Sequence, residues 1–344
     1  MKMLQRLGEY AITCILIVIC TLTLLNLPAW SQACHDCQAT QLPSPFMGNA
    51  VLAPDTFGNP GPSNDPWVIR KHVDEVNVFF TVTKGHKYID DLQPNEVTVT
   101  DDRQPPARIS YFGHQSDLPL RLSLVVDTSN SVHSRFEFEK DAASRFLRQI
   151  VRPQTDQAFV LGFSDKARLA QDYASEPEVL HRGIATLNSG GGTALFDAVQ
   201  LACAKLANHP EDRPTARVLV LLSDGDDNAS KSTLQQAIED AQRKEVTIYS
   251  ISTNNSGYQR PGDEVLRQLA VETGGDMFFP NNAKDTVKAF SAIEQEMRSR
   301  YALFYQPNDL SEDGRYHRIQ IIVQRLRKKF RVHARKGYYA LLTQ

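Results

Sequence analysis

Apolar strands alternate with helical segments between residues 118 and 300, and this alternation constrains the fold more than any other feature of the sequence. Strands are expected at 118–126, 158–163, 218–222, 246–251 and 277–279, and helices at 136–150, 193–207, 234–244, 264–272 and 283–300. The strands are apolar along their whole length, as expected when both faces of a sheet are covered. The pattern therefore predicts an α/β fold with a doubly wound, mostly parallel, Rossmann-like sheet between two layers of helices.

Short strands in which apolar and polar residues alternate flank this region on both sides. Strands are expected at 76–82, 97–99 and 109–111 before it, and a β-hairpin of 319–323 with 330–334 after it. Three short strands are too few for a core of their own. We therefore expect residues 71–117 and 301–341 to pair and to build one small β domain around the α/β domain at 118–300.

The N-terminus has the features of an export signal. Lys2 and Arg6 precede an apolar run at 11–27, and small residues follow it. This order predicts a secretory signal peptide in residues 1–33, with a retained N-terminal anchor or a buried helix as alternatives. The proline-rich and glycine-rich residues 34–70 are predicted to be an extended linker. The remainder is therefore expected to be exported, and to be periplasmic, at the cell surface or secreted.

Charge and cysteine content exclude some classes of protein. A formal net charge of −2 argues against a protein dedicated to nucleic acid. The basic residues at 325–336 are interpreted as a solvated strand edge, with binding of an anionic polymer or lipid as the alternative. Cys34 and Cys37 are interpreted as a local disulfide or two unimportant thiols, and Cys203 as a small buried hydrophobe.

Hydroxyl and carboxylate side chains gather where ligands bind in an open sheet, beyond the carboxyl ends of the strands. They lie after the first strand, at the end of the glycine-rich segment 189–192, and after the strand 218–222. The predicted metal ligands are Asp127, Ser129, Ser131, Thr193 and Asp224. Hard divalent cations prefer six oxygen ligands and keep some water, so this set can hold a cation with an open position. Taken singly, each fragment is equally compatible with a helix cap or a turn.

These motifs resemble the metal-ion-dependent adhesion site of the von Willebrand factor type A (VWA) domain. The flanking strands and the closing segment 335–339 resemble a bacterial group of exported VWA-related proteins. The resemblance implies that the two serines ligate the metal directly, the threonine directly or through water, and the aspartates largely through water. It implies a divalent cation, Mg²⁺ first and Mn²⁺ or Ca²⁺ as alternatives. It also implies a partner protein whose Asp or Glu carboxylate completes the coordination.

The predicted function is therefore that of an exported binding protein, adhesive or scaffolding, without catalytic activity. The sequence has no Gly-x-Ser-x-Gly elbow, no His-Glu-x-x-His pair and no lysine in the loop 189–193. A Mg²⁺-dependent hydrolase or phosphotransfer enzyme that uses the same oxygens is the alternative, but no general base stands out. No nucleic-acid partner is expected, and a membrane contact only through the N-terminal anchor. Asp197 is interpreted as a support of the site or an exposed charge, and residues 226–228 as its rim.

Overall fold

The computed structural model describes residues 75–340, with the exception of 86, 133–134, 255, 310–312 and 326–329. The predicted signal peptide, the linker, Cys34 and Cys37 lie outside the described residues. Within the described part of the chain, no helix has the length and apolar character required to cross a membrane.

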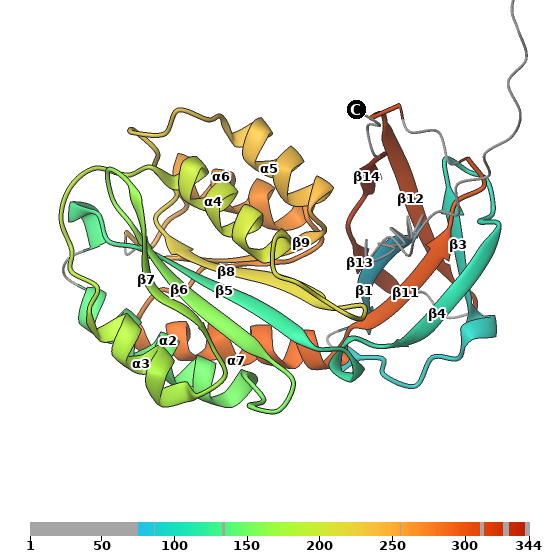
Figure 1. The fold of residues 1–344 in the computed structure, drawn as a ribbon, viewed down its shortest axis with the longest axis horizontal. Helices are drawn as coiled ribbons and strands as arrows, with labels where there is room; N and C mark the ends of the chain where they lie inside the picture. Colours follow the sequence, from blue (N-terminus) through green and yellow to red (C-terminus); the bar gives the residue numbers. More distant parts are fainter. Residues whose placement is uncertain are drawn as a thin grey trace, which may run out of the picture. The chain divides into compact units, whose positions relative to one another are not determined.

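A six-stranded sheet lies at the centre of the α/β region (Figure 1). Its strands are β5 (Leu120–Asp127), β6 (Gln157–Phe163), β7 (Ala167–Ala174), β8 (Ala216–Ser223), β9 (Val246–Ser252) and β10 (Met277–Phe278). They are arranged in the order β10-β9-β8-β5-β6-β7. All neighbouring pairs are parallel except β6 and β7, which are antiparallel. The predicted doubly wound, mostly parallel sheet is confirmed.

Helices cover both faces of this sheet (Figure 1). One layer contains α2 (Phe136–Ile150), α3 (Pro177–Ala185) and α7 (Ala283–Ser299), and the other contains α4 (Leu195–Ala207), α5 (Leu234–Arg243) and α6 (Pro261–Glu272). Neighbouring residues of β5 belong to different cores: Leu124 packs in the core of the first layer and Val125 in that of the second. This two-sided burial explains why the strands are apolar throughout. Cys203 is buried in the second core, as predicted.

The sequence pattern did not reveal β7 or α3. Most residues of β7 are half-buried or exposed, and Leu169 is 45% exposed. An edge strand of this kind lacks the continuous apolar run on which the prediction relied.

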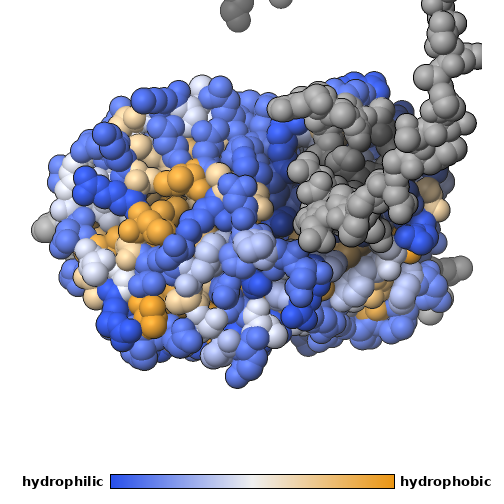
Figure 2. Space-filling model, in the orientation of Figure 1, coloured by the Kyte–Doolittle hydropathy of each residue, from blue (hydrophilic) through white to orange (hydrophobic). Residues whose placement is uncertain are grey.

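Figure 2 shows that hydrophilic side chains cover most of the visible face, while hydrophobic ones gather over part of the α/β region.

Strands from both flanks build two further sheets. The strands are β1 (Val76–Lys84), β2 (Lys87–Tyr88), β3 (Val97–Asp101), β4 (Arg108–His114), β11 (Tyr301–Gln306), β12 (Tyr316–Val323), β13 (Arg331–Ala334) and β14 (Gly337–Tyr339). Three short 3₁₀ turns also occur, η1 (Pro94–Glu96), η2 (Gln115–Asp117) and η3 (Asn130–Val132). One sheet has the order β13-β1-β11-β4, with β2 on β1, and the other has the order β14-β12-β3. In both sheets, strands that precede the α/β region pair with strands that follow it.

The predicted hairpin of 319–323 with 330–334 is wrong. β12 pairs with β3 and β14, whereas β13 pairs with β1. The pairing with β3 places Ile321 opposite Val99 and Val323 opposite Val97. Such apolar cross-strand pairs stabilise a sheet, and the short, partly charged β13 does not provide them to β12. An alternating pattern identifies a strand and its buried face, but it does not identify the partner strand.

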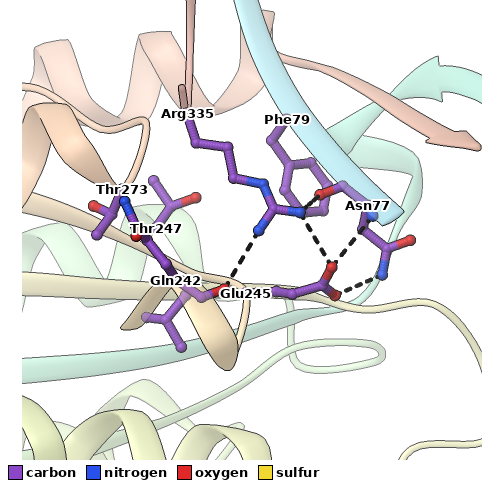
Figure 3. A pocket seen from close by; sticks show the side chains of 8 residues that line it. Asn77, Phe79, Gln242, Glu245, Thr247, Thr273 and Arg335 are labelled. Atoms are coloured by element: carbon purple, nitrogen blue, oxygen red, sulfur yellow. Dashed lines mark hydrogen bonds and ion pairs between the residues drawn. The ribbon is translucent and has the colours of Figure 1, made fainter. Parts of the chain in front are cut away.

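Polar contacts connect the flanking strands to the α/β region, and Figure 3 shows one of these contact sites. The Arg335 guanidinium donates to the Asn77 carbonyl oxygen (2.6 Å) and to Glu245 Oε1 (3.2 Å). Asn77 Nδ2 in turn donates to Glu245 Oε2 (2.7 Å). Arg335 is only 7% exposed. The buried guanidinium therefore needs these hydrogen bonds and this ion pair to replace the water that it loses on burial.

We expect replacement of Arg335 to destabilise the fold. Arg335→Leu removes the positive charge that is paired with Glu245 and the donor to the Asn77 carbonyl, and the free energy of unfolding should fall by about 3 kcal/mol in urea titrations. The neighbouring Lys336→Ala is the control, because the Lys336 side chain is 59% exposed in its pair with Glu272. That variant should stay within about 1 kcal/mol of the wild type. Equal stabilities of the two variants would contradict the role given to Arg335.

Candidate functional site

The carboxyl ends of β5 and β8 lie side by side, and they position Asp127. The two strands are parallel neighbours, with Val126 in register with Leu222. Ser223 Oγ donates to Asp127 Oδ2 (2.7 Å), and the Ser129 amide donates to Asp127 Oδ1 (2.8 Å). Asp127 is completely buried. Both oxygens of this carboxylate are therefore held in fixed positions at the edge of the sheet.

The two serines of the Asp-x-Ser-x-Ser segment point to a common place. Ser129 Oγ and Ser131 Oγ are 2.9 Å apart, at the start of the turn η3. Ser129 is buried and Ser131 is exposed, so the pair reaches from the interior to the surface. Thr128 points away from them, because its Oγ1 donates to the Phe163 carbonyl (2.9 Å).

The glycine-rich loop packs directly against this segment. The Gly190 amide donates to the Thr128 carbonyl (2.6 Å), and the Asn130 amide donates to the Gly191 carbonyl (3.3 Å). Gly191 has a φ of +92°, and a Cβ there would lie 2.6 Å from Asp165 Oδ2. Both the backbone conformation and the close approach require glycine. The loop thereby brings Thr193, which is 4% exposed, to the same edge of the sheet.

The loop after β8 completes the arrangement. The Thr193 amide donates to Asn228 Oδ1 (2.9 Å), and the Asn228 amide donates to the Thr193 carbonyl (3.0 Å). Gly225, with a φ of +81°, packs so closely on α6 that a Cβ would lie 2.0 Å from the Gly262 carbonyl oxygen. This contact fixes the loop that carries Asp224, which is 7% exposed. The three loops therefore contact one another around a single edge of the sheet.

The structure brings the five predicted ligands to this edge in two ways. Hydrogen bonds connect Asp127, Ser129 and Ser131 directly. Thr193 and Asp224 are positioned by the backbone and side-chain contacts of their loops. That all five share one ion stays a prediction.

Negative charge is concentrated behind the site. Burial, together with the charge of Asp224, raises the pKa of Asp127 to about 6 although donors from Ser129 and Ser223 oppose the shift. Burial, together with the charges of Asp127 and Asp224, raises the pKa of Glu139 to about 7 although the charge of Arg135 opposes the shift. In both cases burial is the largest cause, and the neighbouring donors and Arg135 do not offset it.

Sequence reasoning missed Glu139, because nothing in a helical pattern shows that a glutamate faces the core. Its side chain is 2% exposed, its Oε2 has no hydrogen-bond partner within the described residues, and Arg135 Nε is 3.9 Å from Oε1. Ser223 was missed as well, although it directly precedes Asp224. The signal in the sequence was a hydroxyl residue at the end of a buried strand, directly before an aspartate.

Two other aspartates have structural roles. Asp227 Oδ1 accepts from the Leu195 amide (2.8 Å) and from Ser230 Oγ (2.6 Å), so it caps the start of α4. Asp197 accepts from the amides of residues 231 and 232 (3.1 and 3.0 Å) and anchors that loop. Asp197 therefore holds part of the loop that follows β8, and its interpretation as a support of the metal site stays a prediction.

A second group of side chains with the geometry to hold a metal ion lies elsewhere, in the sheet β14-β12-β3. It consists of Asp101, Asp102 and His317. Nothing in the sequence pattern pointed to this group.

We expect Glu139 to make the stability of the metal-free protein depend on pH. Its folded pKa of about 7 lies above the usual value, so the unfolded chain loses the proton first as pH rises. Ionised Glu139 therefore destabilises the folded state above about pH 4. In EDTA, the unfolding free energy of the wild type should fall by about 3 kcal/mol relative to that of Glu139→Gln as the pH rises from about 4 to about 8. Parallel stability profiles of the two proteins would show that Glu139 does not titrate in this way.

Comparisons with known proteins agree with the observed fold. Among curated proteins, none matches the chain. A minor pilin from Streptococcus sanguinis has a similar structure, with 15% identity and a TM-score of 0.43 over 57% of this chain. The chain spans 63% of the length of that pilin.

Two further solved structures are similar. One is a von Willebrand factor type A protein from Catenulispora acidiphila, with 12% identity and a TM-score of 0.45 over 80% of this chain and 76% of that one. The other is proximal thread matrix protein 1 from the mussel byssus, with a zinc-occupied MIDAS motif. It has 18% identity and a TM-score of 0.45 over 53% of this chain and 46% of that one.

The family assignment depends on a sequence match. The model of the von Willebrand factor type A domain matches residues 122–293, which is half of the 344-residue chain. The matched segment begins in β5 and ends in α7, and it contains all three loops of the site. The chain therefore belongs to the von Willebrand factor type A domain family.

Proposed function

We propose that the protein binds a divalent cation at the edge of its central sheet and uses this cation to capture a carboxylate of a protein ligand. The proposed ligands of the metal are Asp127, Ser129, Ser131, Thr193 and Asp224. The observation that carries the proposal is the convergence of three distant loops on a place where buried carboxylates lack compensating charge. A bound cation would supply that charge.

The spacing of the serines supports a magnesium-like ion. Mg²⁺ binds oxygen at about 2.0–2.1 Å in an octahedron, so adjacent ligand oxygens lie about 2.9 Å apart. The separation of Ser129 Oγ and Ser131 Oγ is 2.9 Å. The two hydroxyls can therefore occupy neighbouring positions around one ion without a change of the backbone.

The hydrogen bonds of Asp127 support a metal ion that Asp127 does not ligate directly and that therefore remains electron-poor. Both carboxylate oxygens already accept hydrogen bonds, from Ser223 and from the Ser129 amide. Asp127 therefore balances the charge of the ion at a distance or through water. A cation whose inner ligands are mostly neutral hydroxyls retains affinity for an external carboxylate. This is the chemistry of a binding site for an Asp or Glu of a partner.

The alternative of a hydrolase or phosphotransfer enzyme requires an accessible general base. Glu139 has a pKa near neutrality, but its side chain is 2% exposed and lies behind the site. It cannot reach the proton of a substrate held in front of the exposed Ser131. We therefore propose an adhesive or scaffolding protein. The N-terminal sequence supports export to the periplasm, the cell surface or the medium.

Removal of one hydroxyl should weaken metal binding. Ser129→Ala loses a direct ligand, and we expect its affinity for Mg²⁺ or Mn²⁺, measured by isothermal titration calorimetry, to fall at least tenfold. Ser291→Ala is the matched control, because Ser291 is exposed on α7 and its Oγ bonds to the Val287 carbonyl. Circular dichroism establishes that both variants are folded. Equal affinities in the wild type and Ser129→Ala would refute the assignment.

Partner capture should require both the metal and acidic side chains of the partner. Immobilised wild-type protein is exposed to the native extracellular fraction with Mg²⁺ or with EDTA, and Ser129→Ala is treated in parallel. We expect specific capture only by the wild type with Mg²⁺. Amidation of the carboxylates in the fraction with carbodiimide and ethanolamine should eliminate it. Capture that survives EDTA or amidation would exclude a metal-bridged carboxylate.

A further inference from the structure

The flanking strands bring together a histidine and two aspartates far from the site described above. Asp101 ends β3, Asp102 begins the following turn, and His317 lies on β12. Their potential ligand atoms all lie within 4.8 Å of one another. The three residues are contributed by segments on opposite sides of the α/β region in the sequence.

The distances in this group fit a shared metal ion. His317 Nδ1 lies 3.6 Å from Asp101 Oδ1 and 3.3 Å from Asp102 Oδ2. Zn²⁺ binds nitrogen and oxygen at about 2.0–2.2 Å in a tetrahedron, which places neighbouring ligand atoms about 3.3–3.6 Å apart. The imidazole nitrogen is therefore already at ligand–ligand distance from both carboxylates.

The hydrogen bonds of Asp101 leave one oxygen directed into this group. Asp101 is 6% exposed, and its Oδ2 accepts from the hydroxyls of Tyr305 (2.9 Å) and Tyr338 (2.8 Å). Its Oδ1, the oxygen nearest His317, has no hydrogen-bond partner within the described residues. A buried carboxylate oxygen without a donor is costly. A cation between Oδ1 and the imidazole would remove that cost.

The other two members are also oriented by their surroundings. Asp102 Oδ1 accepts from the Arg318 amide (2.9 Å), which leaves Oδ2 for a second ligand. The His317 ring stacks on Tyr338, with 5.2 Å between ring centroids, and His317 is 5% exposed. Asp102 is exposed, so it connects the buried pair to solvent. Hydrogen bonds and packing of this kind fix metal ligands in place before the ion binds.

We propose that Asp101, Asp102 and His317 form a second metal site that binds a transition-metal ion of the zinc class. Imidazole together with carboxylates selects ions such as Zn²⁺, whereas Mg²⁺ prefers an all-oxygen environment. Water fills the fourth position. The ion joins β3 to β12, so its binding free energy contributes to the stability of the sheet that both flanks build. This site is independent of the proposed adhesion site.

The competing explanation is a proton. A protonated His317 between two carboxylates would compensate the same charge without a metal. In that case added Zn²⁺ would not change the stability, and added Co²⁺ would give no visible absorption bands of a tetrahedral site.

The test is a titration of the full chain with Zn²⁺ in excess Mg²⁺, which saturates the proposed adhesion site. Cys34→Ser and Cys37→Ser are introduced first, so that zinc bound by these two cysteines does not contribute to the titration. We expect one equivalent of Zn²⁺ to bind and to raise the melting temperature. Co²⁺ should give the visible absorption bands of a tetrahedral nitrogen–oxygen site.

Variants locate the ion. His317→Ala and Asp102→Asn should each lower the Zn²⁺ affinity at least tenfold and abolish the Co²⁺ bands. Asp102 is exposed, so its variant remains informative if His317→Ala fails to fold. His333→Ala is the matched histidine control, since His333 is half-buried on β13, and Ser129→Ala controls for the adhesion site. Both controls should bind zinc like the wild type. Undiminished binding in Asp102→Asn, or no binding by the wild type, would overturn the proposal.

Discussion

The parallel pairing of β5 with β8 is the interaction on which the site at the edge of the sheet depends. It places Ser223 next to Asp127, and the 2.7 Å hydrogen bond between them fixes a carboxylate that is completely buried. The Ser129 amide holds the other oxygen, so the first loop takes its conformation from the same carboxylate. The glycine-rich loop then packs on that first loop, and the loop after β8 packs on Thr193. A change in the register of β5 would separate all of these groups.

The cost of this arrangement is electrostatic. Burial raises the pKa of both Asp127 and Glu139, and the charge of Asp224 adds to the cost of ionising each of them. A protein that only needed a stable fold would do better with neutral side chains here. The retained negative charge is understandable if a divalent cation binds at the edge of the sheet. The hydroxyls of Ser129, which is buried, and of Ser131, which is exposed, are then the direct ligands.

In the sequence, the α/β region lies between the two halves of one β structure, and Figure 1 shows the strands of both halves grouped on one side of it. β1 pairs with β11 and β13, and β3 pairs with β12, so both ends of the described chain are held together. Two buried arginines strengthen the contact with the α/β region. Arg335 binds Glu245 and Asn77, and Arg300 donates to the Phe79 and Gly274 carbonyls. The group of Asp101, Asp102 and His317 belongs to this β structure, and it exists only because strands from both flanks meet.

The sequence by itself determined the strands and helices of the α/β region and the alternating strands of the flanks, because periodicity is a local property of the chain. It also placed Asp127, Ser129 and Ser131 in one loop, where their spacing makes a common direction possible. The tertiary structure decided which strands pair, so the expected hairpin of β12 with β13 did not form and the edge strand β7 was added. It also decided that Glu139 faces the core and that His317 meets Asp101. Pairing and burial depend on residues far apart in the chain, and local patterns carry no information about those partners.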